Sequence, residues 1–198
     1  KGDTNMKNVI ITIGILLSTL SNSVYAQTLI GKSFNKKFAD SLLIVKINEK
    51  RVSLGFTPFY KSNNVSNYIS KRNCTIMASG GPAHPEYKWE TDPELKKKMV
   101  LISKEYAKVN KNTNHISPTT QEPYGVRFME VAAYGEGDIT TYESLIDRVI
   151  NGWYNSLGHR ALLLRDDHSL HFNEVSFLGV SIQVIGDRFF ATANIISF

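Results

Sequence analysis

Residues 153–164, Trp-Tyr-Asn-Ser-Leu-Gly-His-Arg-Ala-Leu-Leu-Leu, form the stretch that decides how the fold is interpreted. They continue a segment with apolar side chains at helical spacing, and Leu157-Gly158 is expected to end that helix. His159 would then lie just past the helix end, beside Arg160. A histidine there suits a polar site, but it equally suits a C-terminal helix cap, where a cation is favoured.

Three helices are predicted before this stretch. The first spans residues 36–54, the second is capped by Asn63 or Asn64 and ends at 79–82, and the third opens at 92–94 with proline in its first turn. The shared face of the second helix is expected to hold Val65, Tyr68, Ile69, Arg72 and Ile76. The buried stripe of the third is expected to hold Met99, Ile102, Tyr106 and Val109.

The strands are predicted late in the chain. Residues 126–134 are β-prone, and residues 177–185 and 188–196 read as a hairpin joined by Gly186-Asp187. Between them, Thr140 and Glu143 have the spacing of a capping box that opens the helix leading to Trp153. The order of helices, strand, helix and hairpin predicts an α+β domain with helices packed on an antiparallel sheet.

The first 26 residues are expected to lie outside the folded domain. Residues 1–5 precede Met6 and are interpreted as upstream sequence, and residues 6–26 have the charge, the apolar run and the small residues of a signal peptide. The alternative, a membrane anchor, is disfavoured because the apolar run 9–20 is shorter than the roughly 20 residues that span a bilayer. Cleavage after Ala26 would leave 27–198 as one secreted or periplasmic domain without a membrane span.

Charge and cysteine content narrow the class of protein. The net charge is +5 and the basic run Lys96-Lys97-Lys98 is typical of a solvated helix face, so no nucleic-acid partner is expected. Cys74 is the single cysteine, which excludes an internal disulfide, and its apolar neighbours indicate a buried, inert thiol. An exported domain without disulfides fits a bacterial envelope protein.

Polar residues that could carry chemistry are His84, His115, Glu130 and His159, with Ser156 beside the last. Imidazole and carboxylate groups in one cleft could hold a divalent metal or perform acid–base work. Glu130 could also be a solvent-facing strand residue, and most loop histidines have no special role. A Ser156–His159 nucleophile pair is disfavoured, because no Gly-x-Ser-x-Gly elbow is present.

Four blocks of the sequence, in order, resemble the CAP superfamily, the group of cysteine-rich secretory proteins, antigen 5 and pathogenesis-related proteins. The blocks are residues 47–59, residues 76–79 followed by His84, residues 130–135, and residues 153–164 with Trp-x-x-Ser-x-Gly-His-Arg. The closer resemblance is to the disulfide-free bacterial branch. It covers residues 38–196 and implies a three-layer α-β-α sandwich with a central antiparallel sheet and a large cleft.

The same resemblance implies site residues. In some members the cleft holds two histidines and two acids that bind a divalent cation. Carried over, Glu130 is the first acid, His159 the second histidine and His84 the first histidine, with His115 as a rival. Ser156 stands where the second acid is often found, and Met129 and Val131 replace both usual neighbours of the glutamate. Two histidines and one glutamate would leave open positions, which allows weak Zn²⁺ binding.

The function implied by the resemblance is a non-enzymatic binding or signalling module. Its cleft would take a small ligand, a lipid or an envelope component. A second hypothesis is a hydrolase that acts on peptide or cell-wall substrates through His159 and Glu130. A third is a purely structural interaction module, in which the polar cluster only joins helix to sheet.

Overall fold

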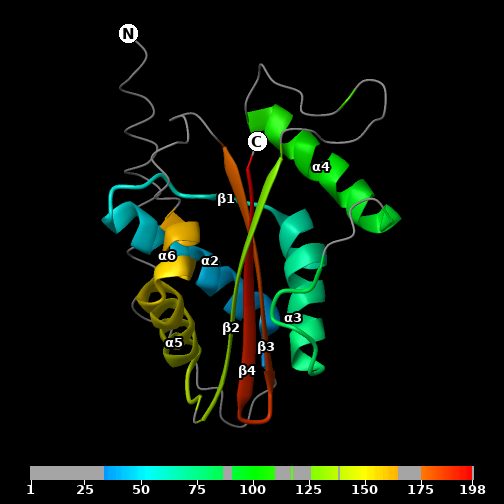
Figure 1. Ribbon diagram of the computed structural model, residues 1–198. Coiled ribbons are helices and arrows are strands. Elements are labelled where there is room, and N and C mark those ends of the chain that lie inside the picture. The colour runs from blue at the N-terminus through cyan, green and yellow to red at the C-terminus, as the bar shows by residue number, and fades with distance from the viewer. Residues whose placement is uncertain are drawn as a thin grey trace.

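The centre of the molecule is a four-stranded sheet in the order β1-β3-β4-β2 (Figure 1). The computed structural model describes residues 34–86, 91–109, 117, 126–137, 139–164 and 175–197. The three long strands, β2 (Arg127–Glu136), β3 (Ser176–Ile185) and β4 (Arg188–Ser197), pair antiparallel. The predicted hairpin of β3 and β4 is confirmed, and Gly186 supplies the positive φ, 64°, that its tight turn requires.

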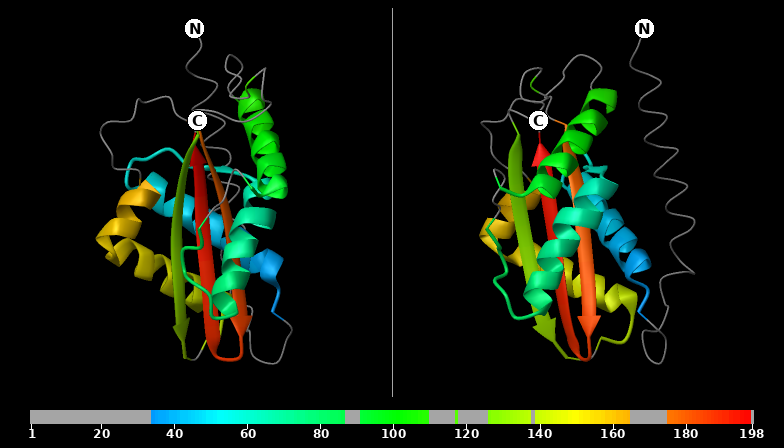
Figure 2. Two further views of the ribbon diagram at one scale, coloured as in Figure 1. Left: turned by 45° about the vertical axis from the view of Figure 1, so that its right-hand side comes forward. Right: turned by 90° about the vertical axis from the view of Figure 1, so that its right-hand side faces the viewer.

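Helices cover both faces of the sheet, which confirms the predicted three-layer sandwich (Figure 1 and Figure 2). α2 (Lys36–Ser53), α5 (Tyr142–Asn155) and α6 (Leu157–Leu164) lie on the first face. The π-helical turn η1 (Val65–Ser70), α3 (Lys71–Ala78) and α4 (Pro93–Val109) lie on the second face. Because side chains alternate along a strand, Val131 packs against the first group and its neighbour Ala132 against the second.

The sheet is mixed, which corrects the expectation of a purely antiparallel one. β1 (Tyr60–Lys61) runs parallel to β3, and the Ser62 N–H extends this pairing by donating to the Leu178 carbonyl at 2.9 Å. Asn48 of α2 fixes the chain that leads into β1, since its side-chain amide bonds both the N–H and the carbonyl of Phe59, at 2.9 and 3.0 Å. A two-residue strand held by a side chain leaves no periodic signal in the sequence.

Arg51, in the block 47–59, has a structural role. This arginine is buried, donates to the carbonyls of Thr57 and Leu163, and lies 3.7 Å above the centre of the Phe59 ring. A buried guanidinium must have such partners to offset its desolvation. Asn48 and Arg51 therefore connect α2, the β1 loop and α6, so that this block serves the fold.

The second predicted helix begins as a π-helix, which changes its buried face. The side chains buried along η1 and α3 include Val65 and Ile69, as expected, but then Asn73, Cys74 and Met77 in place of Arg72 and Ile76. The wider π-turn shifts the phase of the helix face. Asn64 occupies the cap position without a capping bond, and its side chain donates to Glu105 at 2.6 Å instead.

The other helices match the predictions except at their ends. In α4, Met99, Ile102 and Tyr106 are buried, but Val109 is 39% exposed because it is the last residue of the helix. α5 is capped one residue later than expected: Thr141 accepts from the Ser144 N–H at 3.0 Å, and the expected Thr140–Glu143 box is wrong. Because α5 begins at Tyr142 and not one residue earlier, the ring of Tyr142 lies in the core.

Leu157-Gly158 does not end a helical region, as we had expected, but begins α6. Ser156 is the break, with an extended backbone between α5 and α6, and its carbonyl accepts from the Arg160 N–H at 2.8 Å. His159 therefore lies in the first turn of α6, so the C-terminal-cap interpretation is wrong.

Cys74 is fully buried, as the sequence indicated. Its thiol contacts the Phe190 carbonyl at 3.2 Å, and burial raises the pKa of the thiol to about 11. The expected signal peptide at 6–26 and the candidate His115 lie outside the described residues. No helix in the described part of the chain has both the length and the apolar character needed to cross a bilayer.

Candidate functional site

Glu130 lies in the middle of β2, the strand at one edge of the sheet. Strand alternation places its side chain on the same face as Ala132, which packs against α3. The free edge of β2 is also where α6 approaches from the opposite layer. Side chains from both helical layers can therefore meet beside Glu130.

The Glu130 carboxylate is buried and contacts the side chains of Asn73, His84 and Asn194. Its exposed fraction is 7%. One oxygen accepts from the amides of Asn73 on α3 and Asn194 on β4, the latter at 2.6 Å. The other oxygen lies 3.0 Å from Nδ1 of His84. Charge-assisted hydrogen bonds of this kind stabilise a buried carboxylate, so this residue is not the solvent-facing strand position that its pattern also allowed.

His84 reaches Glu130 from the segment that follows α3. Gly80 makes the turn out of the helix with φ 85°, and Gly81 must lack a side chain because a Cβ would meet Ile76 at 2.5 Å. With Glu130 accepting at Nδ1, the neutral ring carries its proton there and leaves Nε2 as an acceptor. The His84 side chain is 56% exposed, so it remains open to solvent.

His159 approaches the same point from α6. Its ring centroid is 6.5 Å from that of His84, with an angle of 46° between the two planes. Burial, and secondly the charge of His84, hold the pKa of His159 below its usual value. The structure therefore presents two imidazoles, with a buried carboxylate behind one of them.

Ser156 is half-buried at the junction of α5 and α6. Among the described residues its hydroxyl has no hydrogen bond to His159, so no Ser–His pair is formed there. The structure thus brings three predicted residues together, His84, Glu130 and His159, with Ser156 three positions away from His159 on the chain.

Asn73 and Asn194 are the site residues that sequence reasoning missed. Asn194 carried a signal, because asparagine is depleted in strands and here stands between apolar residues, Ala193 and Ile195, of strand β4. An amide at such a place must find a partner, and the partner is Glu130. Asn73 gave no comparable signal, since the π-turn that directs it inward is not visible in the pattern.

The described residues contain no cluster of three or more His, Cys, Asp or Glu side chains with the arrangement of a metal site. Both oxygens of Glu130 already contact His84, Asn73 or Asn194. The arrangement suits a carboxylate that orients an imidazole, as second-sphere groups do at metal sites.

Comparisons with known proteins found similarities of fold. No protein-family model and no curated protein matches the sequence. An outer surface protein from Borrelia burgdorferi is similar with a TM-score of 0.48 and 14% identity, over 85% of this chain and 98% of that one. A cysteine-rich secretory protein from Staphylococcus aureus is similar with a TM-score of 0.43 and 16% identity, over 82% of this chain and 40% of that one.

Proposed function

We propose that the chain is an exported binding module that is not an enzyme, and that its ligand binds at the β2 edge between His84 and His159. The observation that carries this proposal is the buried Glu130 carboxylate with its side-chain partners, which fixes the orientation of His84. Export rests on the signal-like sequence of residues 6–26.

Two imidazoles 6.5 Å apart, each of which offers an acceptor nitrogen in its neutral form, favour a ligand with hydrogen-bond donors or a divalent cation. Zn²⁺ is the first to test, because neutral histidine is a common zinc ligand and a carboxylate behind it raises its basicity. With two protein ligands and open positions the affinity would be weak. A small donor-bearing envelope component is the alternative occupant, since it would use the same acceptors.

The experiment titrates the full chain with Zn²⁺ and follows the imidazole ¹⁵N signals by NMR. His84→Gln and His159→Gln should each weaken binding at least about tenfold, the loss of one of two ligands. His171→Gln, the same substitution at a histidine that the proposal does not use, is the matched control. Binding that survives both site substitutions would contradict a zinc site here, and the same variants would then be screened against envelope extracts.

A hydrolase is the second candidate, and the His84–Glu130 contact is the observation that favours it. A carboxylate that orients a histidine is the base half of many hydrolytic sites. That contact would make His84 the base, in place of the His159 expected from the sequence. Turnover of peptide or cell-wall substrates that is lost on His84→Gln would support this candidate, and its absence would reject it.

The structural alternative is distinguished by stability. If the cluster only joins helix to sheet, Glu130→Gln should lower the melting temperature while Zn²⁺ and substrates have no effect on any variant. Under the binding proposal, His159→Gln leaves the melting temperature close to that of the parent and removes only the ligand response.

A further inference from the structure

The backbone of β2 alternates between groups that face β4 and groups that face away from the sheet. Gly137 N–H donates to the Asp187 carbonyl at 3.0 Å, directly opposite in the register that pairs Glu136 with Arg188. In an antiparallel pair only every second residue is bonded in this way. The odd-numbered residues of β2 therefore pair with β4, and the even-numbered ones direct their N–H and carbonyl groups outward.

The opposite side of the sheet supports this assignment. On β3, the even-numbered residues face away from β4, and all three outward groups with printed bonds belong to them. The Leu178 carbonyl accepts from Ser62, the Val180 N–H donates to the Ser66 hydroxyl at 3.2 Å, and the Ile182 N–H donates to Asp40 at 2.8 Å.

Near the C-terminal end of β2, one outward backbone group is hydrogen-bonded and others are exposed. The Glu136 carbonyl accepts from the Arg148 guanidinium at 2.7 Å. Within the described residues, neither the N–H nor the carbonyl of Tyr134 bonds to another protein group, and Tyr134 is 73% exposed. An exposed donor and acceptor on an edge strand form a template for another strand.

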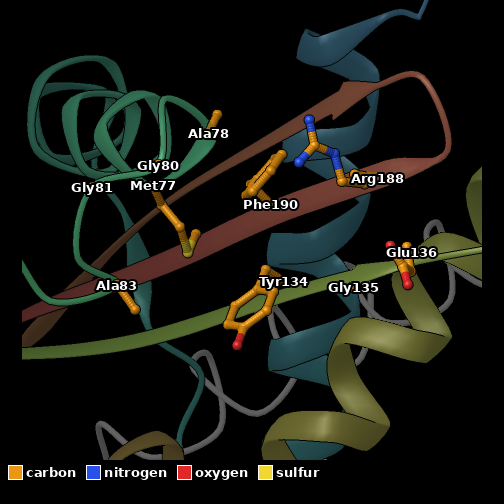
Figure 3. A pocket seen from close by; sticks show the side chains of 10 residues that line it. All are labelled: Met77, Ala78, Gly80, Gly81, Ala83, Tyr134, Gly135, Glu136, Arg188 and Phe190. Atoms are coloured by element: carbon orange, nitrogen blue, oxygen red, sulfur yellow. The ribbon is translucent and has the colours of Figure 1, made fainter.

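A hollow of about 690 Å³ lies directly beside Tyr134, on the α3 face of the sheet (Figure 3). Its volume is in the range of sites that hold small ligands or side chains. Met77 and Ala83 come from the α3 side, Tyr134 from β2, and Phe190 from β4, so that much of the wall is apolar. A side chain opposite Tyr134 on an added strand would point to this same face.

Charge at the end of the hollow favours an acidic group. Arg188 lies with its guanidinium 6.0 Å from the centre of the Phe190 ring, and within the described part of the chain it forms no ion pair. Arg148 is close by on the opposite face, bound to the Glu136 carbonyl. Arg188 and Glu136 line this end of the hollow together, and Arg148 lies on the other face of β2. A free guanidinium is suited to bind a carboxylate.

We propose that the edge of β2 at Tyr134 binds an extended peptide of another protein, which adds a strand to the sheet. One apolar side chain of the peptide fills the hollow and a carboxylate two positions away pairs with Arg188. An extended main chain is the one common ligand that offers a donor and an acceptor at strand spacing. The site uses the backbone of Tyr134 and no imidazole, so it is independent of the proposed function.

The test measures fluorescence anisotropy of labelled hexapeptides with the full chain. The probes alternate threonine with leucine and carry one glutamate, at the first or the last position, so that antiparallel and parallel pairing are both sampled. Each is made with a free and an amidated C-terminus, and with glutamine in place of glutamate. We expect saturable binding of the peptide with glutamate at one of the two positions. Arg188→Gln should remove the preference of the protein for the glutamate peptide over its glutamine counterpart.

Tyr134→Pro is the decisive variant, because it removes an outward N–H and leaves the ladder to β4 intact. It should bind about three- to tenfold more weakly than the matched control Tyr134→Ala, the effect of one lost hydrogen bond. If Tyr134→Pro does not fold, N-methylation of alternate peptide amides gives the same information: one set should abolish binding and the other should not.

Three results would overturn the proposal. The first is no saturable binding of a peptide with glutamate at either position at millimolar concentration. The second is equal binding of both N-methylated sets. The third is a concentration-dependent dimer of the chain that Tyr134→Pro abolishes, because the occupant of the edge would then be a second copy.

Discussion

The two sides of the sheet differ in how the outward backbone groups are satisfied. On the β3 side, the Ser62 N–H just after β1, the Ser66 hydroxyl and the Asp40 carboxylate bond three of these groups, and η1 packs directly over the strand. On the β2 side, the edge carries the polar cluster around Glu130 and then the exposed backbone of Tyr134. Protected edges prevent unwanted strand pairing, so an edge left open is a place where binding is permitted.

The alternation on β2 predicts the largest difference between two neighbouring substitutions. Ala133→Pro should destabilise the fold by about 3 kcal/mol, because it removes an N–H that faces β4 and leaves a carbonyl without its partner. Tyr134→Pro should cost much less, since its N–H faces outward. Urea unfolding of both variants checks this, and equal destabilisation would refute the assignment of inward and outward residues.

The close packing on the β3 side is tested by two glycines. In Gly179→Ala the new Cβ would lie 2.4 Å from the Ser66 backbone nitrogen, so η1 must move, at a cost of about 3 kcal/mol. In Gly135→Ala on β2 the nearest atoms to the new Cβ belong to the Phe189 ring, at 2.7 Å, and this ring can shift, so about 1 kcal/mol is expected. Thermal unfolding distinguishes them, and a reversed order would show that the β3 side is not the tighter one.

Substitutions of Asp40 test whether the β3 edge is stabilised by a hydrogen-bond acceptor or by a negative charge at this position. Asp40→Ala leaves the Ile182 N–H without its partner and should cost about 1–3 kcal/mol, whereas Asp40→Asn keeps an acceptor. Burial, opposed by Lys36, raises the pKa of Asp40 above its usual value. A raised carboxyl pKa gives a stabilising contribution below pH 3.8 that is lost as the pH rises through the folded-state pKa.

The wild type should therefore lose stability relative to Asp40→Asn as the pH rises from about 4 toward neutrality. Unfolding measured across this range tests the sign. A wild type that gains stability relative to Asp40→Asn as the pH rises would contradict a raised pKa at Asp40.

The smallest expected effect concerns the two histidines on the β2 side. Because the charge of His84 is the second cause that lowers the pKa of His159, His84→Gln should raise that pKa part of the way toward its usual value. Burial, the larger cause, remains. NMR titration of the His159 ring measures the change, and an unchanged pKa would show that the rings do not interact electrostatically.

Much of the fold could be predicted because its signals are local. Helical spacing of apolar residues located α2, α4 and α5, and alternation with Gly186-Asp187 located the β3–β4 hairpin. The misses come from interactions with distant residues. β1 depends on Asn48 and on β3, the cap of α5 depends on burying Tyr142, and the π-turn redirects the face of α3.

The sequence alone determined the order of the longer helices and of the three long strands, the candidates His84, Glu130 and His159, and the buried state of Cys74. Only the tertiary structure decided that Glu130 contacts His84, that Asn73 and Asn194 hold its other oxygen, and that His159 opens a helix. The physical reason is that sequence patterns report local interactions, whereas the site is made by residues far apart in the chain. Periodicity reports which face of an element is buried, but which side chains meet across an edge depends on strand order and on helices from two layers, which no local pattern encodes.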